Sequence, residues 1–248
     1  MTAHGLPCWY ELSTSDTDAA ATFYAGIAGW SWADSATPGM NYSLATIDGT
    51  MIAGMMKVEM PGQPVAWTFY VAVDSTDDVV KQAEALGAKA IVPPTDVPDN
   101  GRFSILIDPQ GATFGVLQPL PGGLGGAFDQ KKNGHGNWHD LQCADPAAAL
   151  VFYGALFGWR ADGSMPMGPD MTYHLIARDG LQFGGVFNAS GPAAWKPYFG
   201  VASANAAVEQ IKALGGSVLH GPDEIPGGAF TVDARDPQGA RVAVVGPA

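Results

Sequence analysis

The sequence has few charged side chains and almost no thiols. Charged residues make up 15% of the 248-residue chain, and its two cysteines are Cys8 and Cys143. Two thiols this far apart form neither a disulfide framework nor a zinc-binding spacing, so we expect both to be buried and free. No apolar run has membrane-spanning length, and no charged segment followed by an apolar run opens the sequence, which together predict a cytoplasmic protein.

Basic residues are especially scarce. The chain has 12 Lys and Arg residues against 24 Asp and Glu residues, which gives a formal net charge of −12. A surface of this sign repels polyanions, so neither nucleic acid nor a membrane is expected as a partner. Hydrophobic residues reach 47%, enough for a packed core, and the length suits two domains of ordinary size.

The two halves of the sequence resemble each other. A Trp-x-Glu/Asp-Leu motif opens each half, a Phe-Tyr pair and a Gly-Trp pair follow, and Asp-Pro-Gln-Gly-Ala comes near each end. The paired positions are 9–12 and 138–141, 23–24 and 152–153, 29–30 and 158–159, and 108–112 and 236–240. Residues 119–136 form a Gly- and Pro-rich linker between the halves. The repeat therefore predicts domains at 1–118 and 137–248.

Each half also contains a fainter repeat, in which a strand and a helix are followed by three short strands. In the first half we expect strands at 9–14, 31–33, 42–47, 52–57, 67–73, 90–92, 103–107 and 113–117, with helices at 16–28 and 77–86. Asp16 is the expected N-cap of the first helix, and Gly87 the stop of the second. The pattern predicts an α+β protein made of four βαβββ units.

Paired βαβββ units with these motifs resemble the vicinal-oxygen-chelate superfamily, which includes glyoxalase I, bleomycin-resistance proteins and extradiol dioxygenases. The segments that carry the resemblance are Asp16 to Tyr24, Asp145 to Tyr153 and the two Asp-Pro-Gln-Gly turns. The four-unit chain is most similar to the tandem glyoxalase-like proteins of bacteria that are often labelled hydroxylases or antigens. The resemblance implies two tandem glyoxalase/bleomycin-resistance-like domains with curved, cup-forming mixed sheets.

In the metal-using members of this superfamily, side chains in each cup hold a divalent metal that acts as a Lewis acid. The resemblance places the corresponding positions at Trp9, Thr68, Gly115, Trp138, Lys196 and Ala243. None of these residues is a normal metal ligand, so we expect no metal and no other cofactor. His139 is the one nearby donor, and strand alternation assigns it to the helix-packing face as a structural histidine.

Two carboxylates are the candidate catalytic residues. Glu11 and Asp140 lie two positions after the opening tryptophans, so strand alternation points both into the cups. Burial disfavours the charged form of a carboxylate and makes it a usable general acid or base near neutral pH. The alternative is that each pairs with a local base. Lys196 and Arg241 are projected into the second cup and could neutralise Asp140.

Aromatic side chains are the candidate ligand contacts. Trp9 and Trp138 would either plug the cups or form the floor of an apolar pocket suited to a flat organic ligand. Trp67 and Trp195 are expected to point toward the helices. The other expected ligand-binding residues are Tyr42, Tyr70, Tyr173, His174, Tyr198 and Lys196. Since Ser43 replaces His174 in the first half, one functional cup is an alternative to two.

Three functions remain open from the sequence. The favoured one is a small-molecule binding protein or metal-independent enzyme, monomeric or homodimeric, with an organic ligand in an aromatic-lined cup. The second is a metal-dependent lyase, isomerase or dioxygenase whose ligands have moved to Glu11, Asp140, His139 or His174. The third is a structural or interaction module whose bulky side chains fill both cups.

Overall fold

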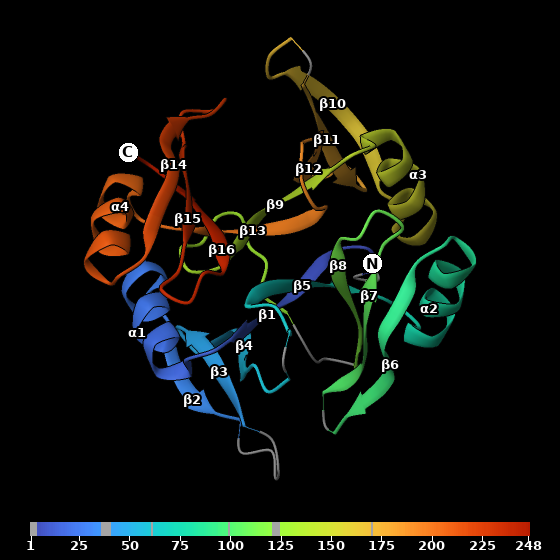
Figure 1. The fold of residues 1–248 in the computed structure, drawn as a ribbon, viewed down its shortest axis with the longest axis horizontal. Helices are drawn as coiled ribbons and strands as arrows, with labels where there is room; N and C mark the ends of the chain where they lie inside the picture. The colour runs from blue at the N-terminus through green and yellow to red at the C-terminus, as the bar shows by residue number, and fades with distance from the viewer. Residues whose placement is uncertain (1–3, 36–40, 61, 99, 121–124, 170) are drawn as a thin grey trace. The chain divides into compact units, whose positions relative to one another are not determined.

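The computed structural model describes residues 4–248 apart from 36–40, 61, 99, 121–124 and 170. Figure 1 shows its helices and strands along the chain. The elements of the first half are β1 Pro7–Thr14, α1 Thr17–Ala28, β2 Ser31–Asp34, β3 Tyr42–Ile47, β4 Thr50–Lys57, β5 Ala66–Ala72, α2 Thr76–Ala85, β6 Lys89–Val97, β7 Gly101–Ile107 and β8 Thr113–Pro119. Those of the second half are β9 Gly136–Cys143, α3 Pro146–Phe157, β10 Arg160–Pro166, β11 Thr172–Arg178, β12 Leu181–Asn188, β13 Ala194–Gly200, α4 Ala204–Ala213, β14 Ser217–Glu224, β15 Phe230–Arg235 and β16 Arg241–Gly246.

These elements form four βαβββ modules, which confirms the predicted α+β fold. Strands β1 to β8 belong to one eight-stranded sheet and β9 to β16 to another. Within the modules the strand orders are β2-β3-β4-β1, β5-β8-β7-β6, β10-β11-β12-β9 and β13-β16-β15-β14. The first strand of each module pairs in parallel with the last, and the other pairs within a module are antiparallel. Both sheets are therefore mixed, with free edges rather than closed barrels.

The ends of the helices follow from local sequence. The side chains of Asp16 and Asp145 accept backbone N–H bonds at the starts of α1 and α3, and Ser75 and Ser203 do the same for α2 and α4. Left-handed glycines end α1 and α3. The predicted Asp16 cap is thus confirmed.

The Asp-Pro-Gln-Gly turns are held by their aspartates. Asp108 Oδ1 accepts the backbone N–H groups of Gln110 at 2.8 Å and Ala112 at 2.9 Å, while Gly111 has a φ of +102° that favours glycine. Asp236 makes the same two bonds in the second half. Both turns therefore reverse the chain between the last two strands of a module, as expected.

The described residues divide into two compact units, each of which combines modules from both halves of the chain. One unit comprises the described residues within 1–8, 69–125 and 139–195, with α2 packed against α3. The other comprises the described residues within 9–68, 126–138 and 196–248, with α1 packed against α4. Residues far apart in sequence therefore contribute to each core.

The core of each unit contains a chain of hydrogen bonds from an indole to a tyrosine to an aspartate. Trp67 Nε1 donates to the Tyr24 hydroxyl at 2.8 Å, and that hydroxyl donates to Asp236 Oδ2 at 3.0 Å. The equivalent bonds in the other unit join Trp195 to Tyr153 at 2.8 Å and Tyr153 to Asp108 at 2.9 Å. Trp67 and Trp195 thus pack toward the helices, as predicted.

The predicted linker, residues 119–136, includes segments with hydrogen bonds to neighbouring residues, and one of the thiols differs from expectation. The Gln130 side chain donates to the Asn137 carbonyl oxygen and the Asn137 side chain to that of Gln130, whereas linker residues 121–124 lie outside the described residues. Both cysteines are free, with Cys143 buried and Cys8 only half-buried. Among the described residues, no helix combines the length and apolar character needed to cross a membrane.

Candidate functional site

In the first half, an indole, a phenol and a carboxylate form a hydrogen-bonded group. Trp9 and Glu11 lie on one face of β1, while Tyr10 and Leu12, both with 0% exposure, lie on the other. Trp9 Nε1 donates to the Tyr42 hydroxyl at 3.2 Å, and this hydroxyl donates to Glu11 Oε2 at 2.9 Å. The structure thus brings together three residues that the sequence analysis selected separately.

A glycine makes this group possible. Strand β4 lies between β3 and β1, and its Gly54 is opposite Glu11 in the parallel pair. A Cβ at Gly54 would lie 1.8 Å from the Tyr42 hydroxyl oxygen, so any larger residue would displace the phenol. The Tyr42 ring therefore crosses β4 through space that the missing side chain leaves open.

The direction of the hydrogen bonds in the Trp9–Tyr42–Glu11 group is fixed by chemistry. An indole N–H can only donate and an ionised carboxylate can only accept, so the Tyr42 proton points at Glu11. Burial, followed by the charge of Glu11, raises the pKa of Tyr42 well above its ordinary value. Tyr42 therefore stays protonated at physiological pH and acts as a donor.

The second half repeats the phenol–carboxylate contact. The Tyr173 hydroxyl donates to Asp140 Oδ1 at 2.5 Å, and Gly185, opposite Asp140 in the β9–β12 pair, leaves space for the phenol. The Tyr173 ring also stacks on Phe187 with centroids 5.8 Å apart. Asp140 is 6% exposed, whereas Glu11 is half-buried, so the two carboxylates differ in their access to solvent.

The other predicted ligand contacts have different surroundings. Tyr70 is buried, and its ring occupies the space beside Gly115. His174 is half-buried and follows Tyr173 on β11, so strand alternation directs it to the opposite face, away from the Asp140–Tyr173 pair. Trp138 is half-buried on β9.

Lys196 belongs to a charged cluster. Its Nζ lies 2.9 Å from Asp233 Oδ2, the same oxygen that accepts Arg241 Nη2 at 2.7 Å, and 4.9 Å from the Tyr198 ring centroid. The side chains of Lys196 and Asp233 are 13% and 17% exposed. Asp233 was not among the residues predicted from the sequence, because its place beside Lys196 and Arg241 depends on the pairing of β13, β15 and β16.

His139 occupies an apolar environment on the helix side of β9. It is 0% exposed, lies against the rings of Phe69 and Phe183, and its Nδ1 is 2.9 Å from the Phe183 carbonyl oxygen. Burial lowers the pKa of His139 to about 4, so the ring is neutral and Nδ1–H is the donor.

The donor set does not fit the divalent metal that the superfamily resemblance implies. Within the described part of the chain, no three His, Cys, Asp or Glu side chains converge on a common point. The carboxylates of Glu11 and Asp140 each accept a tyrosine hydroxyl. Trp9, Thr68, Gly115, Trp138, Lys196 and Ala243, which stand at the expected ligand positions, offer no imidazole, carboxylate or thiolate.

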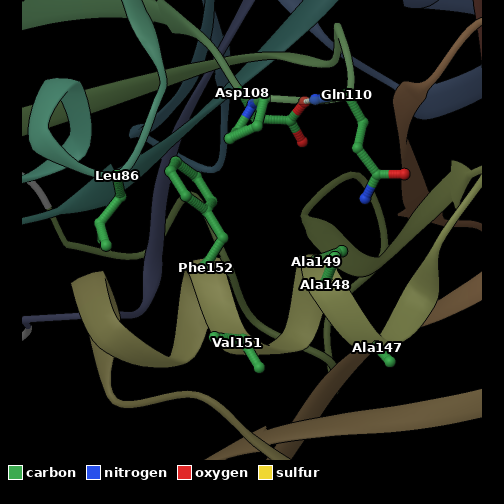
Figure 2. A pocket seen from close by; sticks show the side chains of 9 residues that line it. Leu86, Asp108, Gln110, Ala147, Ala148, Ala149, Val151 and Phe152 are labelled. Atoms are coloured by element: carbon green, nitrogen blue, oxygen red, sulfur yellow. Dashed lines mark hydrogen bonds between the residues drawn. The ribbon is translucent and has the colours of Figure 1, made fainter.

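A pocket of about 430 Å³ lies elsewhere, beside α3 and the turn after β7 (Figure 2). Its walls are mainly apolar and include Leu86, Phe152 and Val151, the last 74% exposed. Its polar residues are engaged internally, because Asp108 accepts the Tyr153 hydroxyl and the Gln110 side chain bonds backbone atoms of Asp145. None of the predicted site residues lines this pocket.

Comparison with known proteins agrees with the fold and the duplication. Residues 9–117 and 138–245 each match the family described as "Glyoxalase-like domain". CFP32 of Mycobacterium tuberculosis is 34% identical over 98% of this chain and 95% of its own length. The anthracycline biosynthesis protein DnrV of Streptomyces peucetius is 33% identical over 98% of this chain and 94% of its own length.

Solved structures with low sequence identity share the fold. The Mn(II)-bound glyoxalase of Novosphingobium aromaticivorans has a TM-score of 0.70 at 17% identity, covering 99% of this chain and 83% of that one. The 2,3-dioxygenase LapB of Pseudomonas sp. KL28 has a TM-score of 0.69 at 13% identity, covering 99% and 93%. Two family matches that span most of the sequence, and relatives aligned over nearly its whole length, place this chain in the glyoxalase-like domain family, within the vicinal-oxygen-chelate superfamily.

Proposed function

We propose that this protein binds a small organic molecule without a metal ion, using the strand faces that carry the phenol–carboxylate contacts. The observation that carries the proposal is the repetition of that contact: Tyr42 with Glu11, and Tyr173 with Asp140, each next to a glycine that leaves room for the phenol. A fold that needed only a filled interior would not require a carboxylate at this position in both halves.

The Trp9–Tyr42–Glu11 group suits a flat ligand with a hydrogen-bond donor. The Trp9 ring is 8% exposed and would form an aromatic wall at the inner end of the site, while Glu11 on the same strand face is half-buried and within reach of a ligand. A ligand hydroxyl or ammonium group would donate to Glu11, which could also accept its proton. The association of DnrV with anthracycline biosynthesis supports an aromatic ligand class.

Metal independence is part of the proposal and rests on the donor set. The related fold of the Mn(II)-bound glyoxalase makes metal chemistry the natural alternative. Trp9 and Trp138 stand where the superfamily resemblance places metal ligands. Their aromatic rings support binding of an organic molecule by aromatic contact instead. We also propose that the protein is cytoplasmic and monomeric or homodimeric. Its net charge of −12 supports the proposal that it binds neither nucleic acid nor a membrane.

A thermal-shift screen of chelator-treated protein tests this function. A native-state ligand raises the melting temperature, so we expect flat aromatic compounds with hydroxyl or amine donors to do so, and Mn²⁺ alone to have no effect. Glu11→Gln should reduce the shift. Glu84→Gln, which removes the same charge from an exposed position on α2, should leave it unchanged. A shift with Mn²⁺ and none with aromatic compounds would favour the metal-dependent alternative.

A further inference from the structure

The Lys196–Asp233–Arg241 cluster differs from the corresponding region of the first half. In the second half, Asp233 and Tyr198 are both paired with Ala243 across neighbouring strands, and in the first half Ile105 and Tyr70 are both paired with Gly115. The register therefore makes Ile105 the equivalent of Asp233. By the same alignment, Thr68 and Thr113 are the equivalents of Lys196 and Arg241.

This comparison indicates that the fold does not need the three charges. Removing charged groups from water costs free energy that their mutual attraction only partly returns, and replacing a buried ion cluster with neutral residues is often stabilising. The first half has neutral residues at these three positions and keeps the same strand pairing. A feature that one copy of a duplicated fold omits, and that is costly to bury, points to a role in binding.

The geometry around Asp233 also favours an anionic ligand. Its Oδ2 accepts both Lys196 Nζ and Arg241 Nη2, so one carboxylate holds two cations side by side. Two cations and one carboxylate give the cluster a net positive charge, which attracts a negatively charged group.

A buried aromatic ring lies next to Lys196. In the first half, the Tyr70 ring fills the space beside Gly115. Ala243 is the buried equivalent of Gly115, and the Tyr198 ring instead lies beside the Lys196 ammonium. Cation and ring together match a molecule that carries a negative group on an aromatic body.

We propose that the Lys196–Asp233–Arg241 cluster binds the carboxylate of a small aromatic acid, with Lys196 and Arg241 as donors and Tyr198 as the adjacent ring. The inference rests on the proposed small-molecule function and names a ligand class for the second half. The first half lacks the cations, so one such site per chain is expected.

Calorimetric titration with benzoate and with neutral benzamide tests this assignment. Charge-assisted hydrogen bonds should make benzoate bind on the order of 10-fold more tightly than benzamide. Lys196→Met, which keeps the Arg241–Asp233 pair, should remove most of that preference. Lys212→Met is the matched control, because it removes an exposed lysine on α4 and should leave the preference intact.

A second variant separates binding from folding. K196T/D233I/R241T installs the first-half residues, and we expect it to keep or raise the melting temperature while losing the preference for benzoate. Equal affinity for benzoate and benzamide in the wild type would overturn the inference and leave the proposed function standing. Failure of both probes and of every other aromatic compound to bind, even at millimolar concentration, would overturn both.

Discussion

At the scale of single residues, Gly54 controls the Trp9–Tyr42–Glu11 group. We expect Gly54→Ala to displace the Tyr42 ring, break its bond to Glu11 and lower the free energy of unfolding by about 1–3 kcal/mol, because buried polar groups lose their partners. Urea denaturation measures this loss. On a Tyr42→Ala background the clash is absent, so the same glycine substitution should cost much less. An equal cost in both backgrounds would show that the ring position does not depend on Gly54.

His139 is expected to make the stability of the folded protein depend on pH. Its folded pKa of about 4 lies below the ordinary 6.5, so its contribution is present above pH 6.5 and is lost as pH falls toward 4. The free energy of unfolding should fall by about 3 kcal/mol across this pH range. His139→Phe should flatten the curve of unfolding free energy against pH in this window, as measured by urea denaturation at several pH values. Parallel curves for the two proteins would contradict this assignment.

Residue-level reasoning from the sequence selected the members of the phenol–carboxylate contacts but not the contacts themselves. Alternation along β1 placed Glu11 and Trp9 on one face, but the Tyr42 bond also depends on the order β3-β4-β1 and on the register that puts Gly54 opposite Glu11. The sequence does not specify that register. Asp233 was missed for the same reason, because its partners come from β13 and β16.

At the scale of elements, buried tyrosines tie α1 and α3 to the Asp-Pro-Gln-Gly turns. Tyr24→Phe would leave the Trp67 N–H without its acceptor and Asp236 Oδ2 without this donor. We expect a loss of about 1–3 kcal/mol in unfolding free energy, and a similar loss for Tyr153→Phe. The double variant should show the sum of both losses in denaturant titrations, since the tyrosines share no hydrogen-bond partner. Losses close to zero would mean that other groups satisfy the aspartates.

Helices, strands and turns were the most predictable level. Asp16 marked the start of α1, Gly87 marked the end of α2, and the Asp-Pro-Gln-Gly repeats marked the last turn of each half, because caps and turns depend on a few neighbouring residues. Which segments of the chain form each compact unit was harder to predict from the sequence. The repeat divides the sequence at the linker, whereas the pairing of α2 with α3, and of α1 with α4, depends on packing between distant segments.

At the scale of the whole molecule, duplication provides an internal comparison. Both halves keep the phenol–carboxylate contact, while the charged cluster around Asp233 occurs only in the second. We interpret the shared contact as the basis of ligand binding and the unshared cluster as the source of ligand selectivity. A duplicated chain can divide these roles because the fold is maintained in both copies while only one of them carries the costly charges.

Ligand binding by metal-free protein is the most direct test of the proposed function. We would titrate chelator-treated protein calorimetrically with the strongest aromatic compound from the thermal-shift screen, with and without Mn²⁺. The predicted result is the same affinity in both titrations and a weaker affinity for Glu11→Gln. Binding that appears only after Mn²⁺ is added would contradict metal-independent recognition by the Trp9–Tyr42–Glu11 group.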